Sequence, residues 1–221
     1  TAVNSLHQTI YFLRRIFAEG SFSSAFVPVL SELREKGDEA QIQDFLNHIA
    51  GALLAAVLLV TACGIALSPW LARLFLLLAD KDSELVALTA AMMRITFPYL
   101  AFISMTALAG AVMNSFRHFG LPAFIPVLHN LAIIFAILVL AQYFEVPAFA
   151  LAWGVFLAGL LQFCVMWPAL RRFGLKPHFK LNFKHPGVQR VFKLMLPTIF
   201  SSSVAQLNLL VGTVFAAGLV V

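Results

Sequence analysis

The chain contains 221 residues, of which 61% are hydrophobic and 11% are charged. Soluble domains are usually about 45–50% apolar and about 25% charged, so this composition excludes a soluble globular enzyme and a disordered chain and indicates an integral membrane protein. The formal net charge of +5 does not require a nucleic-acid partner, because membrane proteins concentrate lysine and arginine in their cytoplasmic connections.

The N-terminal segment predicts the inner end of a membrane span, a break, and a short second helix. After a polar start, Tyr11–Phe17 is apolar except for Arg14 and Arg15. Gly20 then interrupts the apolar pattern, which resumes over Phe22–Leu30. Because glycine is a poor residue for a helix interior, we expect the chain to leave one helix near this residue and begin another.

Five later stretches are apolar enough to be transmembrane helices. A membrane-spanning helix needs about 20 apolar residues, whereas a transmembrane β-barrel would show short segments of alternating polarity. The stretches are Ile49–Leu67, Ile95–Phe116, Phe119–Phe144, Val146–Leu170 and Leu194–Val221. The sequence therefore predicts an all-α fold, a polytopic bundle of transmembrane helices.

The charges in the connections predict the orientation of these helices. Residues 171–193 hold seven lysines and arginines, whereas residues 144–147 hold none; we group residues 31–48 and 114–120 with the first as rich connections and residues 69–84 with the second as a poor one. Rich and poor connections alternate along the chain, as successive membrane crossings require. The positive-inside rule places the rich connections in the cytoplasm.

Charged residues within an apolar segment are the strongest candidates for function. In a helix Arg15 and Glu19 share one face at i, i+4, while Arg14 points about 100° away. Such charges cost several kcal/mol when they face lipid, so we expect them to face water, a partner or a cavity. One interpretation is an anion site in which Arg14 binds a phosphate through two hydrogen bonds and Glu19 holds Arg15. The other is an anchor at the cytoplasmic end of a span.

Polar residues at other positions of the spans are weaker candidates. Asn114 and Asn130 could contact a substrate, although most such groups form hydrogen bonds between helices. The sequence contains no nucleophile elbow, phosphate-binding loop or zinc-protease motif, and its cysteines and histidines lack the spacing of a structural metal site. We therefore expect no catalytic residue, no cofactor and no metal site in this segment.

Small residues predict where helices pack closely. Ala150, Gly154 and Ala158 recur at i, i+4 and i+8, which places them on one helix face and lets a neighbouring helix approach. Cys63 and Cys164 lie in apolar runs, and we interpret them as small buried side chains, because free cysteine packs like a small hydrophobic residue.

Several segments together resemble one family of bacterial membrane proteins. The run Leu13–Phe22, which contains Arg14, Arg15 and Glu19, and the following Ala25–Leu30 closely resemble the MurJ/MviN family of lipid II flippases. The first of these runs is specific, and the remaining matches are supportive. Those matches are Ile95–Tyr99, Gly110–Ser115, Pro122–Phe124 with Asn130, and Ala150–Gly154, so the resemblance covers about residues 12–221.

The resemblance implies a fold of two helical bundles around a central cavity, as in the multidrug, oligosaccharidyl-lipid and polysaccharide exporter superfamily. Residues 1–170 would form the first bundle without its first helix. Residues 171–192 would be a basic cytoplasmic linker, and residues 193–221 would begin the second bundle. The chain is expected to be a fragment of a larger protein, and residues 1–11 are expected to depart from the family.

The resemblance also implies the function. The protein would not be an enzyme but a transporter of the bacterial inner membrane, which moves lipid II, a peptidoglycan precursor, from the cytoplasmic to the periplasmic leaflet by alternating access. Arg14 matches an arginine that the family uses for the lipid-linked pyrophosphate, and Arg15 and Glu19 match with weaker inference. The partners would be lipid II and membrane lipids, with room for contacts to cell-wall synthesis or division proteins.

Two other functions fit the same residues. The protein could export another polyprenyl-linked saccharide or drugs, or it could be a non-transporting membrane scaffold that holds cell-wall enzymes through its basic linker. The cluster of Arg14, Arg15 and Glu19 argues against a pure scaffold, because charge within a span is costly without a use.

Overall fold

The computed structural model describes residues 21–76, 83–172, 178–198, 200–201 and 204. Its elements are α2 (Ser21–Glu35), α3 (Glu39–Leu76), α4 (Ser83–Thr96), α5 (Tyr99–Ser115), α6 (Gly120–Phe135), the π-helical turn η2 (Ala136–Leu140), the 3-10 turn η3 (Ala141–Tyr143) and α7 (Ala148–Arg172). A further helix covers residues 186–198. The described residues contain no strand, so the all-α prediction is confirmed.

Four of the helical segments are long and apolar enough to cross a membrane. They are Glu39–Leu74, Glu84–Ser115, Gly120–Tyr143 and Ala148–Arg172. They correspond to the first four predicted stretches, and the chain is therefore a multi-pass membrane protein. The fifth predicted stretch, Leu194–Val221, lies mostly outside the described residues.

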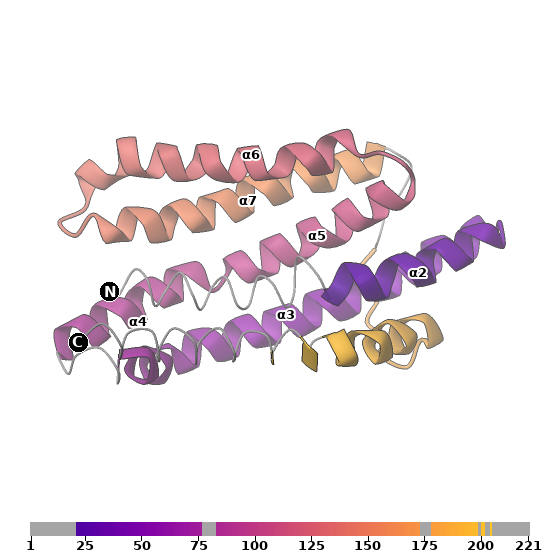
Figure 1. Cartoon of the computed structure of the whole chain (residues 1–221), viewed down its shortest axis with the longest axis horizontal. Helices are drawn as coiled ribbons and strands as arrows, with labels where there is room; N and C mark the ends of the chain where they lie inside the picture. The colour runs from indigo at the N-terminus through magenta and orange to yellow at the C-terminus, as the bar shows by residue number, and fades with distance from the viewer. Residues whose placement is uncertain (1–20, 77–82, 173–177, 199, 202–203, 205–221) are drawn as a thin grey trace.

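The basic connections gather at one end of the molecule. The α2–α3 connection, the α5–α6 connection and the end of α7 lie at the right of Figure 1, while the α6–α7 connection and α4 lie at the left. The predicted alternation of rich and poor connections is thus confirmed in space. We call the end that holds the α2–α3 connection, the α5–α6 connection and the end of α7 the basic end; its cytoplasmic location stays a prediction.

The helix α3 continues past the point where the sequence predicted a connection. Residues 69–84 were expected to lie outside the helices, but α3 runs through Pro69 to Leu76. Proline has no N–H and so leaves the carbonyl four residues earlier without its helical donor, which here is the carbonyl of Ile65. The Ser68 hydroxyl donates to this oxygen at 2.9 Å, and Arg94 Nε donates to the Ser68 hydroxyl at 3.0 Å. This relay from α4 replaces the missing hydrogen bond and lets α3 continue.

A break at Pro98 separates α4 from α5 and places two aromatic rings against glycines. A Cβ atom on Gly64 of α3 would lie 2.1 Å from Phe97 Cε1, and one on Gly159 of α7 would lie 2.6 Å from Tyr99 Cδ2. Neither distance is sterically allowed, so both rings need a glycine opposite them. The break thereby brings α3 and α7 into contact with the same point of the span Glu84–Ser115.

The predicted small-residue face is confirmed. Ala150, Gly154 and Ala158 are all buried, and a Cβ on Gly154 would lie 2.5 Å from the Cβ of Ala136 in η2. The prediction of buried cysteines is wrong, because Cys63 and Cys164 are both exposed. A span that is apolar on every face does not reveal which face points toward the core.

The Ser68 relay makes a testable contribution to stability. Ser68→Ala should destabilise the protein by about 1–3 kcal/mol, because the Ile65 carbonyl would lose its side-chain donor in a partly buried position. Thermal unfolding in detergent measures the effect. Ser115→Ala is the matched control: its hydroxyl donates to the Ala111 carbonyl, and no proline removes the helical donor of that oxygen. An equal loss in both variants would contradict the relay.

Candidate functional site

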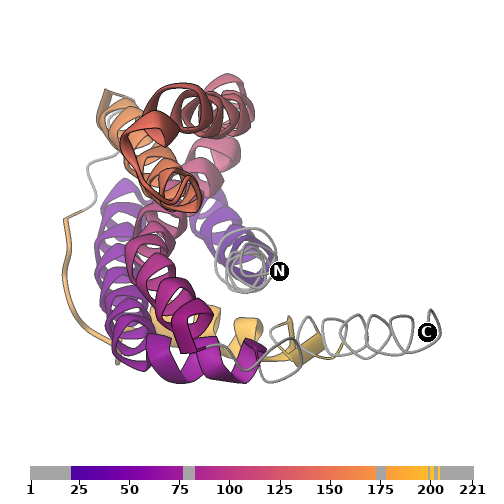
Figure 2. The same cartoon turned by 90° about the vertical axis from the view of Figure 1, so that its left-hand side faces the viewer.

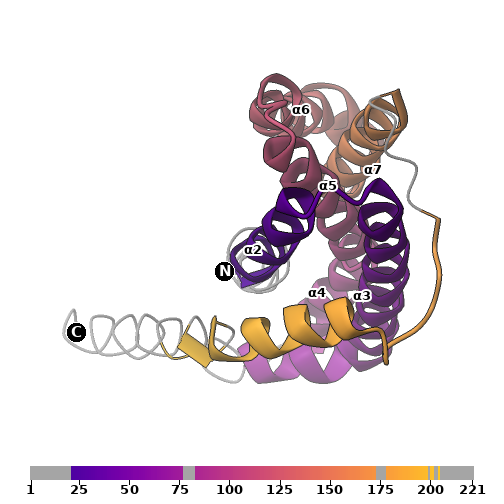
Figure 3. The same ribbon diagram turned by 90° about the vertical axis from the view of Figure 1, so that its right-hand side faces the viewer.

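After α7, residues 178–198 lie against α2 and α3. Figures 2 and 3 show residues 178–185 descending past α3 and the helix 186–198 crossing on the side away from α6 and α7. We call the contact of residues 178–198 with α2 and α3 the junction. It contains hydrogen bonds and ion pairs between residues 178–198 and these two helices, and it is the candidate functional site.

The sequence-predicted site residues fall into two groups. Arg14, Arg15 and Glu19 lie outside the described residues. Asn114 is exposed in the last turn of α5, and Asn130 is exposed on α6. Only 17% of the apolar membrane-spanning part of Gly120–Tyr143, which includes α6, is buried. The structure thus places one asparagine at the basic end and the other along a largely unburied helix, and their role in substrate binding stays a prediction.

The helix α2 is fixed to both α3 and α5. Phe22 stacks on Phe26 at 5.2 Å between ring centroids, and Phe26 stacks on Phe45 of α3 at 5.7 Å. At the other end of α2, Arg34 lies 4.5 Å from the Phe116 ring centroid and donates to the main-chain oxygen of Ser115. This arginine therefore connects α2 to the end of α5, next to Asn114.

The helix 186–198 packs against the same core. Val188, Val191 and Met195 are at most 5% exposed and belong to the cluster that α2 and α3 form. Their spacing of three and four residues is that of one helix face. This helix begins at residue 186, seven residues before residue 193, where the sequence predicted the start of the second bundle.

The segment before this helix lies directly on α3. The main-chain N–H of His178 donates to Asn47 Oδ1 at 2.7 Å, and that of Lys180 donates to the Asn47 carbonyl at 3.1 Å. A Cβ on Gly51 would come within 2.3 Å of the Lys180 carbonyl oxygen. Asn47 is 6% exposed, so this linker segment is bound to the helix surface by specific hydrogen bonds.

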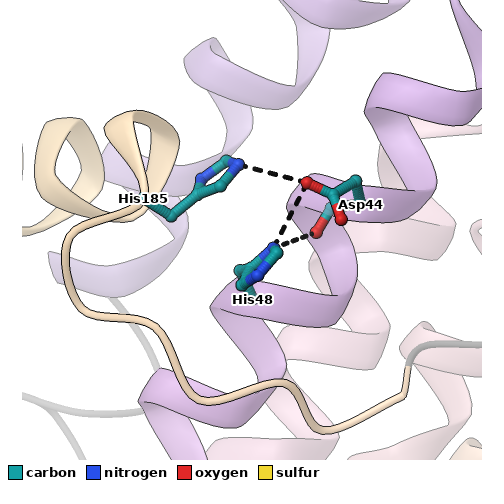
Figure 4. A group of neighbouring side chains, drawn as sticks. All are labelled: Asp44, His48 and His185. Carbon is teal, nitrogen blue, oxygen red and sulfur yellow. Dashed lines mark hydrogen bonds and ion pairs between the residues drawn. The ribbon is translucent and has the colours of Figure 1, made fainter.

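Asp44, His48 and His185 form a cluster at the junction, as Figure 4 shows. His48 Nδ1 lies 3.3 Å and His185 Nε2 lies 3.4 Å from Asp44 Oδ2, and the Lys180 ammonium lies 3.5 Å from Asp44 Oδ1. Two imidazoles and a carboxylate are groups that hold divalent metal ions. Sequence reasoning missed this set because His185 is far from α3 in the chain; only the i, i+4 pair of Asp44 and His48 signalled it.

An ion pair fastens the helix 186–198 to α2. Arg190 Nη1 lies 2.6 Å from Glu32 Oε2, and Lys36 Nζ lies 3.2 Å from Glu32 Oε1. The hydrogen bonds from Lys36 and Arg190 hold the pKa of Glu32 below its ordinary value of 4.5. A carboxyl whose pKa is lowered by folding stabilises the folded state above the ordinary pKa, and this contribution disappears as the pH falls through the lowered pKa.

This sign gives a pH-dependent prediction. Glu32→Gln should lower the unfolding temperature slightly at neutral pH, and the difference from the unaltered protein should shrink below the ordinary pKa and vanish below the lowered pKa. Exposed ion pairs contribute little, so the effect should be small and should weaken in high salt. Unfolding temperatures measured across pH test it, with Glu35→Gln on the same helix as the control. A difference that persists in acid would contradict the ion-pair explanation.

Comparison with known proteins identifies the family. A family model described as "Lipid II flippase MurJ" matches residues 3–220. The expected departure of residues 1–11 from the family is therefore wrong over most of that segment. A solved structure of the lipid II flippase MurJ in an inward closed conformation superposes with a TM-score of 0.71 at 25% identity, over 94% of this chain and 42% of that chain.

Similar proteins from known bacteria point the same way. The lipid II flippase MurJ of Burkholderia cenocepacia is 40% identical over 94% of this chain and 41% of its own length. The probable lipid II flippase MurJ of Haemophilus influenzae is 41% identical over 93% of this chain and 42% of its own length. The chain thus spans about two fifths of the length of these relatives. Because the family model matches nearly the whole chain, the chain belongs to the lipid II flippase MurJ family.

Proposed function

We propose that this chain is part of a flippase that moves lipid II from the cytoplasmic to the periplasmic leaflet of the bacterial inner membrane. The observation that carries the proposal is the match of residues 3–220 to the MurJ family model. The names of the relatives favour lipid II over other lipid-linked saccharides or drugs. A transporter of this kind needs no catalytic residues, since it changes the position of its substrate and breaks no bond.

The physical problem is to carry a charged head group across about 30 Å of hydrocarbon. A cavity must replace the water that surrounds the pyrophosphate, and arginine does this well because its planar donors match phosphate oxygens. In this proposal Arg14 binds the pyrophosphate, and Glu19 orients Arg15 beside it. Asn114 and Asn130 are the weaker candidates for contacts to the sugar-peptide portion.

The proposed transport requires two bundles that move relative to each other. In our proposal residues 1–170 belong to the first bundle, residues 171–192 form the linker and residues 193–221 begin the second bundle. The junction supports a mechanical connection between them, because Val188 and Val191 pack in the core of the first bundle and Arg190 pairs with Glu32. Rotation of the second bundle would pull directly on α2 and α3.

A scaffold for cell-wall enzymes is the second function to test. It would depend on the exposed basic residues of the linker, such as Lys184, and would not depend on Arg14. The transport proposal makes the opposite assignment. Additional binding of cell-wall synthesis or division proteins is compatible with either function.

The Arg14 assignment predicts a large loss of transport. In cells depleted of their own flippase and supplied with the full-length protein, Arg14→Ala should lower periplasmic exposure of lipid II on the order of 10- to 100-fold, because charge-assisted hydrogen bonds to the pyrophosphate are lost. An externally added enzyme that cleaves outward-facing lipid II measures the exposure. Arg14→Lys should recover only part of the activity, because lysine keeps the charge without the paired donors.

The control is Arg73→Ala, which removes an exposed arginine of α3 near the end opposite the basic end. It should expose lipid II normally. Normal exposure in Arg14→Ala, with equal amounts of protein in the membrane, would remove Arg14 from the proposed site. No exposure with the unaltered protein would instead favour export of another lipid-linked saccharide.

A further inference from the structure

We propose that Asp44, His48 and His185 form a binding site for a divalent transition-metal ion that ties residue 185 to α3. The proposal does not depend on the lipid that the protein carries. It starts from three potential ligand atoms that lie within 4.8 Å of one another. Two come from adjacent turns of α3, and the third comes from the residue that immediately precedes the helix 186–198.

Two of the three separations between ligand atoms fit a tetrahedral metal ion. Zinc binds imidazole nitrogen at about 2.0–2.1 Å and carboxylate oxygen at about 2.0–2.2 Å, so two ligand atoms of a tetrahedral site lie about 3.3–3.5 Å apart. The distances from Asp44 Oδ2 to His48 Nδ1 and His185 Nε2 are 3.3 Å and 3.4 Å. One oxygen of the carboxylate therefore already lies at the correct distance from both nitrogen atoms.

The two histidine side chains of the cluster are more buried than its carboxylate, so the cluster is not a fully solvated group of surface residues. The side chains of His48 and His185 are 14% and 22% exposed, whereas that of Asp44 is 45% exposed. The two imidazole rings stack at 4.6 Å between centroids, with an angle of 12° between their planes. An imidazole nitrogen binds a metal in the plane of its ring, so one of these nearly parallel rings must turn when both bind the same ion. The carboxylate side stays open to water. Two histidines and one carboxylate with an open fourth position are a known zinc ligand set.

The hydrogen bonds define what must change when the metal binds. Gly187 N–H donates to His185 Nδ1 at 3.2 Å, which places the proton of the neutral ring on Nε2, facing Asp44. His48 Nδ1 also lies 2.9 Å from the Asp44 carbonyl oxygen. Metal binding replaces the imidazole protons at these two nitrogen atoms. The proton of each ring then sits on its other nitrogen, so His185 Nδ1 no longer accepts from the Gly187 N–H and this hydrogen bond is lost.

Lys180 provides a neighbouring charge that opposes the metal. Its ammonium lies 3.5 Å from Asp44 Oδ1 and leaves Oδ2 for the ion. A cation this close to a divalent metal weakens binding by electrostatic repulsion. Removal of the lysine charge should therefore tighten metal binding, an effect that a damaged fold cannot imitate.

The experiment titrates Zn²⁺ into the full-length protein in detergent and follows binding by calorimetry. We expect one equivalent to bind, a rise in the unfolding temperature, and a tetrahedral absorption spectrum when Co²⁺ replaces Zn²⁺. Asp44→Asn, His48→Ala and His185→Ala should each weaken binding by at least about 100-fold, since even the loss of an outer hydrogen-bond partner costs 10–100-fold. Lys180→Gln should bind Zn²⁺ several-fold more tightly.

The matched control is His178→Ala, which removes an exposed histidine of the same linker segment whose main-chain N–H, not its ring, contacts α3. It should bind Zn²⁺ like the unaltered protein. Unchanged affinity in His185→Ala, or weaker binding in Lys180→Gln, would overturn the site. Absence of stoichiometric binding in the unaltered protein would show that the residues form a hydrogen-bonded cluster only.

Discussion

The requirement that every main-chain polar group has a partner in a medium without water shapes this structure. Helices meet it internally, and prolines within the helices are the places where it fails. At Pro69 two side chains replace the missing donor. The Ser68 hydroxyl, in the same helix, donates to the Ile65 carbonyl, and Arg94 of α4 donates to that hydroxyl. The length of α3 depends on this repair, and so does the position of α4, which begins only after α3 has ended.

Close approach of the helices follows from the same medium. Hydrocarbon gives no hydrophobic drive for helices to associate, so packing and shape must provide it. Gly64 and Gly159 accept the rings of Phe97 and Tyr99, while Gly154 accepts Ala136. These contacts join α3, the span Glu84–Ser115, η2 and α7 through positions where no larger side chain fits. The break at Pro98 is thus part of the packing, because it sets the direction of the two rings beside it.

The junction differs in character from these apolar contacts. It combines an apolar helix face with polar groups that water can reach, including the Glu32–Arg190 ion pair and the cluster around Asp44. Polar contacts of this type are weaker than packed apolar ones and can break and form again. In the proposed transporter they lie where movement would pass from one bundle to the other. A metal ion bound at Asp44 would strengthen the junction without adding further residues to it.

The sequence by itself determined the class of the protein, its four described spans, the gathering of its basic connections and the small-residue face of α7, because each depends on local composition or helical period. It also carried the family resemblance through Arg14, Arg15 and Glu19, residues whose arrangement the structure does not describe. The tertiary structure decided the rest. Pro69 lies inside a helix because a residue of α4 supports it, and Cys63 and Cys164 face outward because neighbouring helices choose the buried face. His185 meets Asp44 because a linker folds back across α3, and no pattern within either segment contains that information.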